Sequence, residues 1–131
     1  MREPVWLDEH DARLLHDRLL ARHGGAPGIR DEGGLKSAVE GPRHHAIYSE
    51  ETSLTHLAAI YTGAILRNHP FVDGNKRTGF LLGVLFLELN GLRFTARQED
   101  AANAVIALAS GVMKEETYAA FLRDNAAQSH E

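Results

Sequence analysis

Segment 68–79, NHPFVDGNKRTG, brings together residue types that can act on a phosphate. A strongly apolar run, 80–89, follows at once and predicts a helix. Lys76 and Arg77 therefore fall in the first turn of that helix. The helix dipole is positive there and disfavours each cation by roughly 0.3–1 kcal/mol. Two cations in this position indicate a bound anion.

The other features of the segment suit the same anion. The first N–H groups of a helix have no partner within the helix and, with the dipole, bind anions. Gly74 lets a ligand approach the backbone closely. Lys76 adds a positive charge, and Arg77 can hold a phosphate through two parallel hydrogen bonds. These features favour phosphate.

Three further side chains could serve a reaction at that phosphate. Asn75 offers an amide donor and acceptor, and Asp73 offers a carboxylate that can hold Mg²⁺ together with substrate phosphates. His69 can act as a base near neutral pH. The residues predict transfer of a phosphorus group from a nucleotide to a hydroxyl.

A plainer interpretation stays open on the residues alone. Asp, Gly and Asn are common in ordinary turns, a histidine before a proline is usually a surface residue, and both cations could point to solvent. The sequence contains neither a GxxxxGK[ST] phosphate loop nor an HExxH metal motif.

Composition limits the class of protein. The chain of 131 residues is long enough for one domain, 1–131, with a real core. Its net charge of −4 argues against a dedicated nucleic-acid binder. It has no cysteine, no apolar leader segment, and no apolar run near the roughly 18 residues of a membrane span. We expect a soluble cytoplasmic protein with no membrane partner.

Helix signals dominate the chain and predict an all-α fold, a compact six-helix bundle. The expected helices cover 8–23 with Asp8 as its cap, 35–40, 54–68 with Thr52 or Ser53 as its cap, 75–90, 98–110 and 115–125. Helix 75–90 is apolar almost all round, so we expect it to be the buried central helix. Its glycines, Gly79 and Gly83, indicate a closely packed neighbouring helix.

The segment after the second expected helix is harder to assign. Gly41 and Pro42 predict that this helix stops, because proline disfavours the helical conformation in the residue before it. We expect segment 43–51, RHHAIYSEE, to form a loop or a short β-hairpin. A brief extended link is expected at 92–96, LRFTA.

The motif closely resembles the signature of the Fic/Doc superfamily, H-P-F-x-[D/E]-G-N-[G/K]-R, which here reads HPFVDGNKR over 69–77. The lysine at its eighth position is similar to the Doc (death-on-curing) branch. Segment 28–44, GIRDEGGLKSAVEGPRH, also resembles the family's G-x-R-D-x-G-L-L-x-x-A-x-x-x-P stretch. The two helices flanking the motif resemble the family's central helices, so the resemblance covers about residues 5–122.

The resemblance implies a six-helix Fic/Doc fold and a Doc-type toxin of a toxin–antitoxin module. Such a toxin transfers the terminal phosphate of ATP to a threonine of elongation factor Tu and so blocks translation. His69 would be the general base, and Asp73 would position Mg²⁺ or the histidine. Gly74 and Asn75 would line an anion hole, and Lys76 and Arg77 would hold the phosphates. The alternatives are AMP transfer of the Fic type and a non-catalytic module that binds its antitoxin.

Two departures from the Fic pattern favour phosphate transfer. Lys76 replaces the small glycine that leaves room for phosphate in AMP transfer, and Phe80 replaces a second arginine. The family's inhibitory [S/T]-x-x-x-E-[G/N] motif is absent from the sequence. A second chain must then control the toxin, and the resemblance implies a Phd-type antitoxin whose flexible segment folds as a helix into a groove.

Four other positions carry open alternatives. The resemblance implies that His44 and His45 belong to a flap that guides the target, but a polar loop with two incidental histidines explains them as well. A zinc site of these two histidines with His69 lacks any spacing signature. Arg30 and Asp31 match the family's R-D pair, and we expect them to serve as a local ion pair or helix cap.

Overall fold

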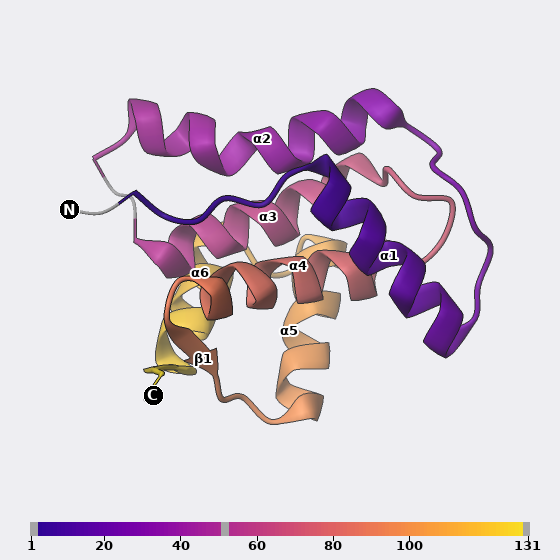
Figure 1. Cartoon of the computed structure of the whole chain (residues 1–131). Helices are drawn as coiled ribbons and strands as arrows, with labels where there is room; N and C mark the ends of the chain where they lie inside the picture. The colour runs from indigo at the N-terminus through magenta and orange to yellow at the C-terminus, as the bar shows by residue number, and fades with distance from the viewer. Residues whose placement is uncertain (1–2, 51–52, 130–131) are drawn as a thin grey trace.

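The computed structural model describes residues 3–50 and 53–129, and Figure 1 shows their arrangement. The helices of this part of the chain are α1 (Glu9–His23), α2 (Glu32–Tyr48), α3 (Leu54–Asn68), α4 (Asn75–Leu89), α5 (Gln98–Ser110) and α6 (Glu115–Asp124). Two short strands, β1 (Leu92–Phe94) and β2 (Ala126–Gln128), pair antiparallel. The predicted all-α, six-helix fold is confirmed.

The central helix is α3. Eleven of its fifteen residues are buried, against seven of the fifteen in α4. Helices α2, α4 and α6 all pack extensively on α3. The expectation that the helix after the motif is the most buried is therefore wrong, because only one side of α4 faces α3. Apolar as these helices are, none within 3–50 and 53–129 has the length and hydropathy needed to cross a membrane.

Helices α3 and α4 pack closely at two glycines, as the sequence predicts. A β-carbon on Gly83 would lie 2.5 Å from Thr62 Oγ1 and 3.0 Å from the Ala58 carbonyl oxygen. A β-carbon on Gly79 would lie 3.3 Å from the Ile65 side chain. The Thr62 hydroxyl also donates a hydrogen bond of 2.7 Å to the Gly79 carbonyl oxygen. The missing side chains allow the two backbones to approach.

The predicted end of the second helix is wrong. The helix continues through Gly41 and Pro42 to Tyr48, where the sequence predicts a stop and a loop or hairpin. Gly41 has no β-carbon to clash with the proline ring that follows it, so the usual restriction on that residue is relaxed. The Pro42 ring is itself buried, as are Ala38 and Val39 on the preceding turn. Burial of this face offsets the hydrogen bond that proline cannot make.

No β-hairpin flap forms in segment 43–50, since residues 43–48 are helical. Glu51, the last residue of the predicted hairpin, lies outside the described residues, as does Thr52, one of the two predicted caps. The other predicted cap is confirmed, because the Ser53 hydroxyl accepts a hydrogen bond from the His56 N–H at 3.3 Å. The sheet that does form pairs β1, which follows α4, with β2, which follows α6.

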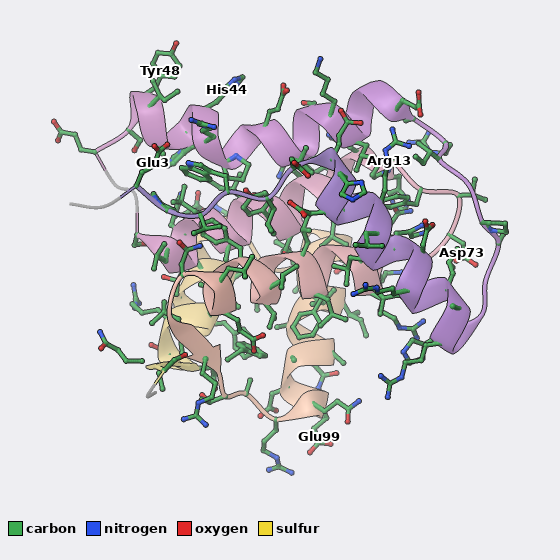
Figure 2. The ribbon with its side chains drawn as sticks, in the orientation of Figure 1. Glu3, Arg13, His44, Tyr48, Asp73 and Glu99 are labelled. Carbon is green, nitrogen blue, oxygen red and sulfur yellow. The ribbon has the colours of Figure 1, made fainter. Side chains whose placement is uncertain are left out.

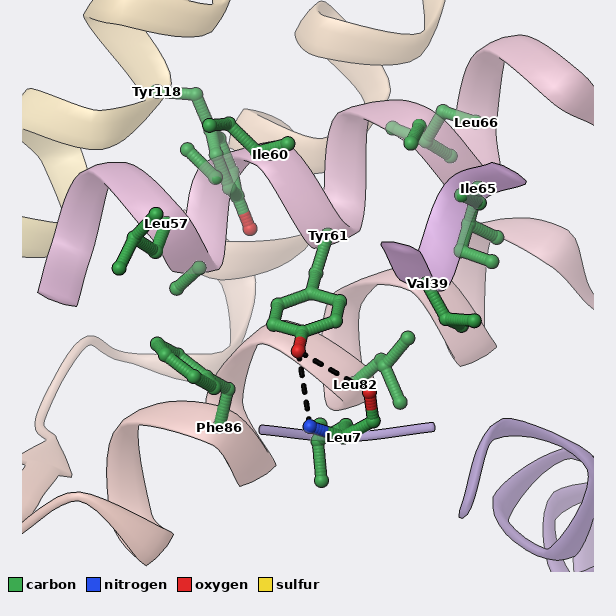
Figure 3. Packing of buried hydrophobic residues seen from close by; sticks show 14 of the residues in the cluster. Leu7, Val39, Leu57, Ile60, Tyr61, Ile65, Leu66, Leu82, Phe86 and Tyr118 are labelled. Carbon is green, nitrogen blue, oxygen red and sulfur yellow. Dashed lines mark hydrogen bonds between the residues drawn. The ribbon is translucent and has the colours of Figure 1, made fainter. Parts of the chain in front are cut away.

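The N-terminal segment lies along the α3–α4 pair and leads into α1 (Figure 1). The Leu7 N–H donates to the Tyr61 hydroxyl at 3.0 Å, and that hydroxyl donates to the Leu7 carbonyl oxygen at 3.4 Å (Figure 3). Burial raises the pKa of Tyr61 to about 12. The Asn90 amide makes a similar pair of bonds to the backbone of Val5. A capping box at Asp8 then starts α1, which crosses beside the start of α4 (Figure 1).

We expect Gly83→Ala to lower the free energy of unfolding by about 1–3 kcal/mol through overpacking, although alanine favours a helix by about 1 kcal/mol. Urea denaturation followed by circular dichroism measures this change. Gly33→Ala is the matched control, because its β-carbon would meet only the Asp31 carboxylate at an ordinary 3.7 Å. The control should be as stable as the wild type or slightly more so. A Gly83→Ala variant of unchanged stability would contradict the close packing.

Candidate active site

His69 occupies a constrained position at the end of α3. Its backbone is left-handed, with φ 46° and ψ 55°, and its N–H donates to the Ile65 carbonyl oxygen at 3.0 Å. It is the one non-glycine residue with a positive φ in the described part of the chain. Such conformations carry a cost and tend to occur at functional sites. Pro70 follows and prevents α3 from continuing.

Arg30 holds this helix end from outside. Its Nε donates to the His69 carbonyl oxygen at 2.7 Å, and its terminal nitrogen donates to the Asn68 carbonyl oxygen at 2.6 Å. The backbone N–H groups of Arg30 and Asp31 both donate to the Pro70 carbonyl oxygen. Asp31 caps α2 by accepting from the Gly34 N–H at 2.8 Å. The capping role expected for this pair is confirmed.

Asn75 joins the motif loop to His69. Its Oδ1 accepts from the Phe71 N–H at 3.0 Å, and its Nδ2 donates to the Phe71 carbonyl oxygen at 2.9 Å. These two bonds fix the amide orientation, so Nδ2 also donates to His69 Nδ1, 3.3 Å away. The network assigns the proton of a neutral His69 to Nε2. The buried Asn75 side chain thus holds both the loop and the histidine, and its backbone N–H, in the first turn of α4, has no helical partner.

The start of α4 is open. Gly74 is its N-cap, in a left-handed conformation with φ 81°, and no side chain of the described residues caps this end. The next three residues therefore present N–H groups without a helical partner. Lys76 and Arg77 are exposed, and neither forms an ion pair with any residue of 3–50 or 53–129. The first turn of α4 thus combines two exposed cations with N–H groups that have no helical partner, a combination that suits an anion.

Asp73 lies beside this open end, and its carboxylate accepts two hydrogen bonds. Oδ1 accepts from the Gly74 N–H at 2.9 Å, and Oδ2 accepts from the Ala26 N–H at 3.1 Å. Two of its roughly four lone-pair positions are thus used. The described residues contain no group of three or more metal-ligating side chains. One carboxylate fits Mg²⁺ only where phosphates supply further ligands, which is the usual way of binding Mg²⁺ to a nucleotide.

His44 and His45 lie far from the motif. Both belong to α2, and the His45 ring is 4.8 Å from the ring of His56, in the first turn of α3. His69 follows His56 by thirteen positions along α3, which corresponds to roughly 20 Å. Figure 2 shows His44 on α2 toward the upper left and Asp73 on the right-hand side of the molecule. The structure therefore does not support a flap role for these histidines at the motif, or a zinc site that joins them to His69.

A groove of about 600 Å³ begins at Lys76 and Arg77. It runs between α4 and α5, and its walls are mainly apolar. Its apolar lining includes Phe80, Leu81, Phe94, Val105 and Ile106. The sequence does not reveal where a groove lies, because α1, α4, α5 and the β1 region each contribute to this one and no local pattern connects them.

Comparison with known proteins agrees with the motif geometry. Residues 6–87 match the model of the Fic/DOC family, so the chain belongs to this family. It is 34% identical over 109 residues to the protein kinase doc of Escherichia phage P1, covering 83% of this chain and 86% of that protein. It is 37% identical over 89 residues to the toxin Doc of Mycolicibacterium smegmatis, covering 63% of this chain and 68% of that protein. Within the family, the chain is of the Doc type.

We expect neutral His69 to carry its proton on Nε2, because Nδ1 accepts from Asn75. In Asn75→Asp the carboxylate can only accept, so the preferred tautomer should change to Nδ1–H. Ring ¹⁵N chemical shifts distinguish the two forms. His16 is an internal control, since its Nε2 donates to the Asp73 carbonyl oxygen in both proteins. A wild-type His69 that is mainly Nδ1–H would contradict the assigned network.

Proposed function

We propose that this protein is a cytoplasmic Doc-type toxin that transfers the terminal phosphate of ATP to a threonine hydroxyl of elongation factor Tu. One observation carries the proposal: the uncapped start of α4, with Lys76 and Arg77 exposed, lies beside His69. The relative in phage P1 is named a protein kinase, and the relative in M. smegmatis is named a toxin, which supports the same activity here.

The first step is binding of the ATP phosphates at the start of α4. The N–H groups of Asn75, Lys76 and Arg77 point out of the helix end, and the helix dipole stabilises negative charge there. The two side-chain cations add full charges, and Arg77 can hold phosphate oxygens in a bidentate manner. Asp73 would hold Mg²⁺, which would neutralise charge on the phosphates.

The second step is attack of the acceptor hydroxyl. Its oxygen forms a bond to the γ-phosphorus while the bond from that phosphorus to ADP breaks, and its proton passes to His69. Nε2 can take this proton only when Nδ1 carries the other one, whereas in the present arrangement Nδ1 accepts from Asn75. Nε2 therefore becomes available as a base only after the ring proton moves to Nδ1 and the 3.3 Å hydrogen bond from Asn75 to Nδ1 is given up.

Control of the activity would come from a second chain. The sequence lacks the family's inhibitory glutamate motif. The apolar groove between α4 and α5 matches the helix-in-groove mode of recognition, and its cationic end suits an acidic residue. We therefore assign the groove to the C-terminal segment of a Phd-type antitoxin. An occupant of this groove also covers Lys76 and Arg77, which would block phosphate binding.

Labelled ATP tests the activity. We expect label in the γ-position, and not label in the α-position, to reach elongation factor Tu with the wild-type protein. His69→Ala should lower the rate about 10²–10⁴-fold, the usual contribution of a general base. His10→Ala, an exposed histidine of α1, is the matched control and should keep the wild-type rate.

Two outcomes would contradict this proposal. Transfer of the α-label alone would show AMP transfer. Growth arrest that His69→Ala leaves unchanged, with no label transferred from either position, would show a non-catalytic module.

Lys76→Gly tests the residue that distinguishes the Doc branch. We expect slower phosphate transfer, because a charge on the phosphate is lost, and some AMP transfer, because space opens beside Gly74. Lys36→Gly on the exposed side of α2 removes the same charge and costs about the same helix propensity, roughly 1 kcal/mol. This control should leave both activities unchanged. Equal rates and products for Lys76→Gly and the wild type would refute the role of this lysine.

A further inference from the structure

A buried histidine outside the motif contacts the motif loop. His16 lies on the inner face of α1, and its side chain is almost fully buried. Its Nε2 lies 2.8 Å from the carbonyl oxygen of Asp73. A carbonyl oxygen can only accept, so Nε2 carries a proton and donates. The phosphate site described above makes no use of this side chain.

The His16 ring also holds a second residue of the loop. It stacks on the Phe71 ring, with 3.8 Å between the centroids and 8° between the planes. Phe71 is itself buried, and its backbone is held by Asn75 and by a bridge to Ile29. His16 therefore makes two contacts with the loop. Its ring stacks on the buried Phe71, and its Nε2 binds the carbonyl of the Asp73–Gly74 peptide, which leads into α4.

The orientation of that peptide sets the shape of the phosphate site. No cis peptide bond occurs within the described residues, so the Asp73 C=O and the Gly74 N–H point in opposite directions. Because His16 holds the Asp73 C=O toward α1, the Gly74 N–H points away from α1. There it donates a hydrogen bond of 2.9 Å to Asp73 Oδ1. Gly74 then turns the chain, with φ 81°, into the first turn of α4.

We propose that His16 is a positioning residue for phosphate transfer: its hydrogen bond to the Asp73 carbonyl fixes the Asp73–Gly74 peptide, and this peptide directs the free N–H groups that follow it toward a phosphate of ATP. This inference rests on the proposed function. A role in core packing alone would be met by an apolar residue, without the expense of burying a polar ring. The donor on this ring acts on one acceptor, and that acceptor belongs to the phosphate-binding turn.

Two substitutions separate the hydrogen bond from the ring. His16→Phe keeps a ring that can stack on Phe71 and removes the donor. His16→Gln removes the ring and keeps a donor near the position of Nε2. Leu122→Ala is the control for a general loss of stability. It removes a buried side chain of α6, outside the motif, and leaves a cavity in the core. All proteins are compared at a temperature at which circular dichroism shows each of them folded.

We expect His16→Phe to lower kcat at least about tenfold and to raise KM for ATP, because misplaced groups at a transferring phosphate slow the reaction strongly. KM for the protein acceptor should stay unchanged. His16→Gln should lie closer to the wild type than His16→Phe does, and Leu122→Ala should keep wild-type constants.

The inference is overturned if His16→Phe behaves like Leu122→Ala, or if His16→Gln is the less active of the two variants. Calorimetric binding of ATP separates this result from a failure of the proposed function. A wild type that binds ATP and transfers no phosphate refutes the proposed function alone, and the inference then stands or falls on whether His16→Phe weakens ATP binding. A wild type that binds no ATP overturns both.

Discussion

The site depends on how closely α4 packs against α3. The two helices are consecutive and antiparallel, so the end of one lies beside the start of the other. Without β-carbons at Gly79 and Gly83, the Thr62 hydroxyl and the Ala58 carbonyl lie directly against the α4 backbone. This contact sets the distance between His69, at the end of α3, and the first turn of α4. A wider separation would break the 3.3 Å contact from Asn75 to His69.

The antiparallel packing of α3 and α4 also brings two helix ends of opposite partial charge together at the motif loop. The end of α3 is the negative end of its dipole, and Arg30 neutralises it by binding two of its last carbonyl oxygens. The start of α4 is the positive end, and there the chain adds Lys76 and Arg77 instead of an acidic cap. The end of α3 is thus satisfied within the protein, whereas the start of α4 has no side-chain cap among the described residues. Helices α5 and α6 also begin without a side-chain cap, but acidic residues in their first turns balance the dipole, whereas the first turn of α4 carries two cations, which suits a bound anion.

Local signals in the sequence predicted most of the fold and the core of the candidate site. The side chains of Asp8 and Ser53 cap the starts of α1 and α3. Gly111 ends α5 in a left-handed conformation. The motif residues 69–77 are contiguous, so their proximity needed no tertiary information. Pro42 was misleading because the rule for proline assumes a preceding residue with a β-carbon, and here that residue is Gly41.

The parts that the sequence did not reveal depend on contacts between distant segments. His16 is separated from Asp73 by 57 positions, and nothing in the pattern of α1 distinguishes it from a solvent-facing histidine. The groove draws its walls from α1, α4, α5 and the β1 region, and its lining shows no periodicity of its own. His44 and His45 were assigned to a flap by the family resemblance, and only the structure shows that α2 places His45 beside His56 in the first turn of α3, away from the motif.

Phe80 bears on both the proposed phosphate transfer and its proposed control by an antitoxin. The Fic pattern has an arginine at this position, where it would be a further phosphate ligand, and the chain has instead an aromatic ring that lines the groove and packs edge-on against Phe94 at 5.7 Å. An arginine here would place a charge in the apolar groove and would have to be desolvated by any helix that docks there. On the proposed function, Phe80 therefore both omits the further phosphate ligand of the Fic pattern and provides apolar surface for an antitoxin helix. On the proposed function, the choice of reaction and the dependence on an antitoxin are linked through this side chain.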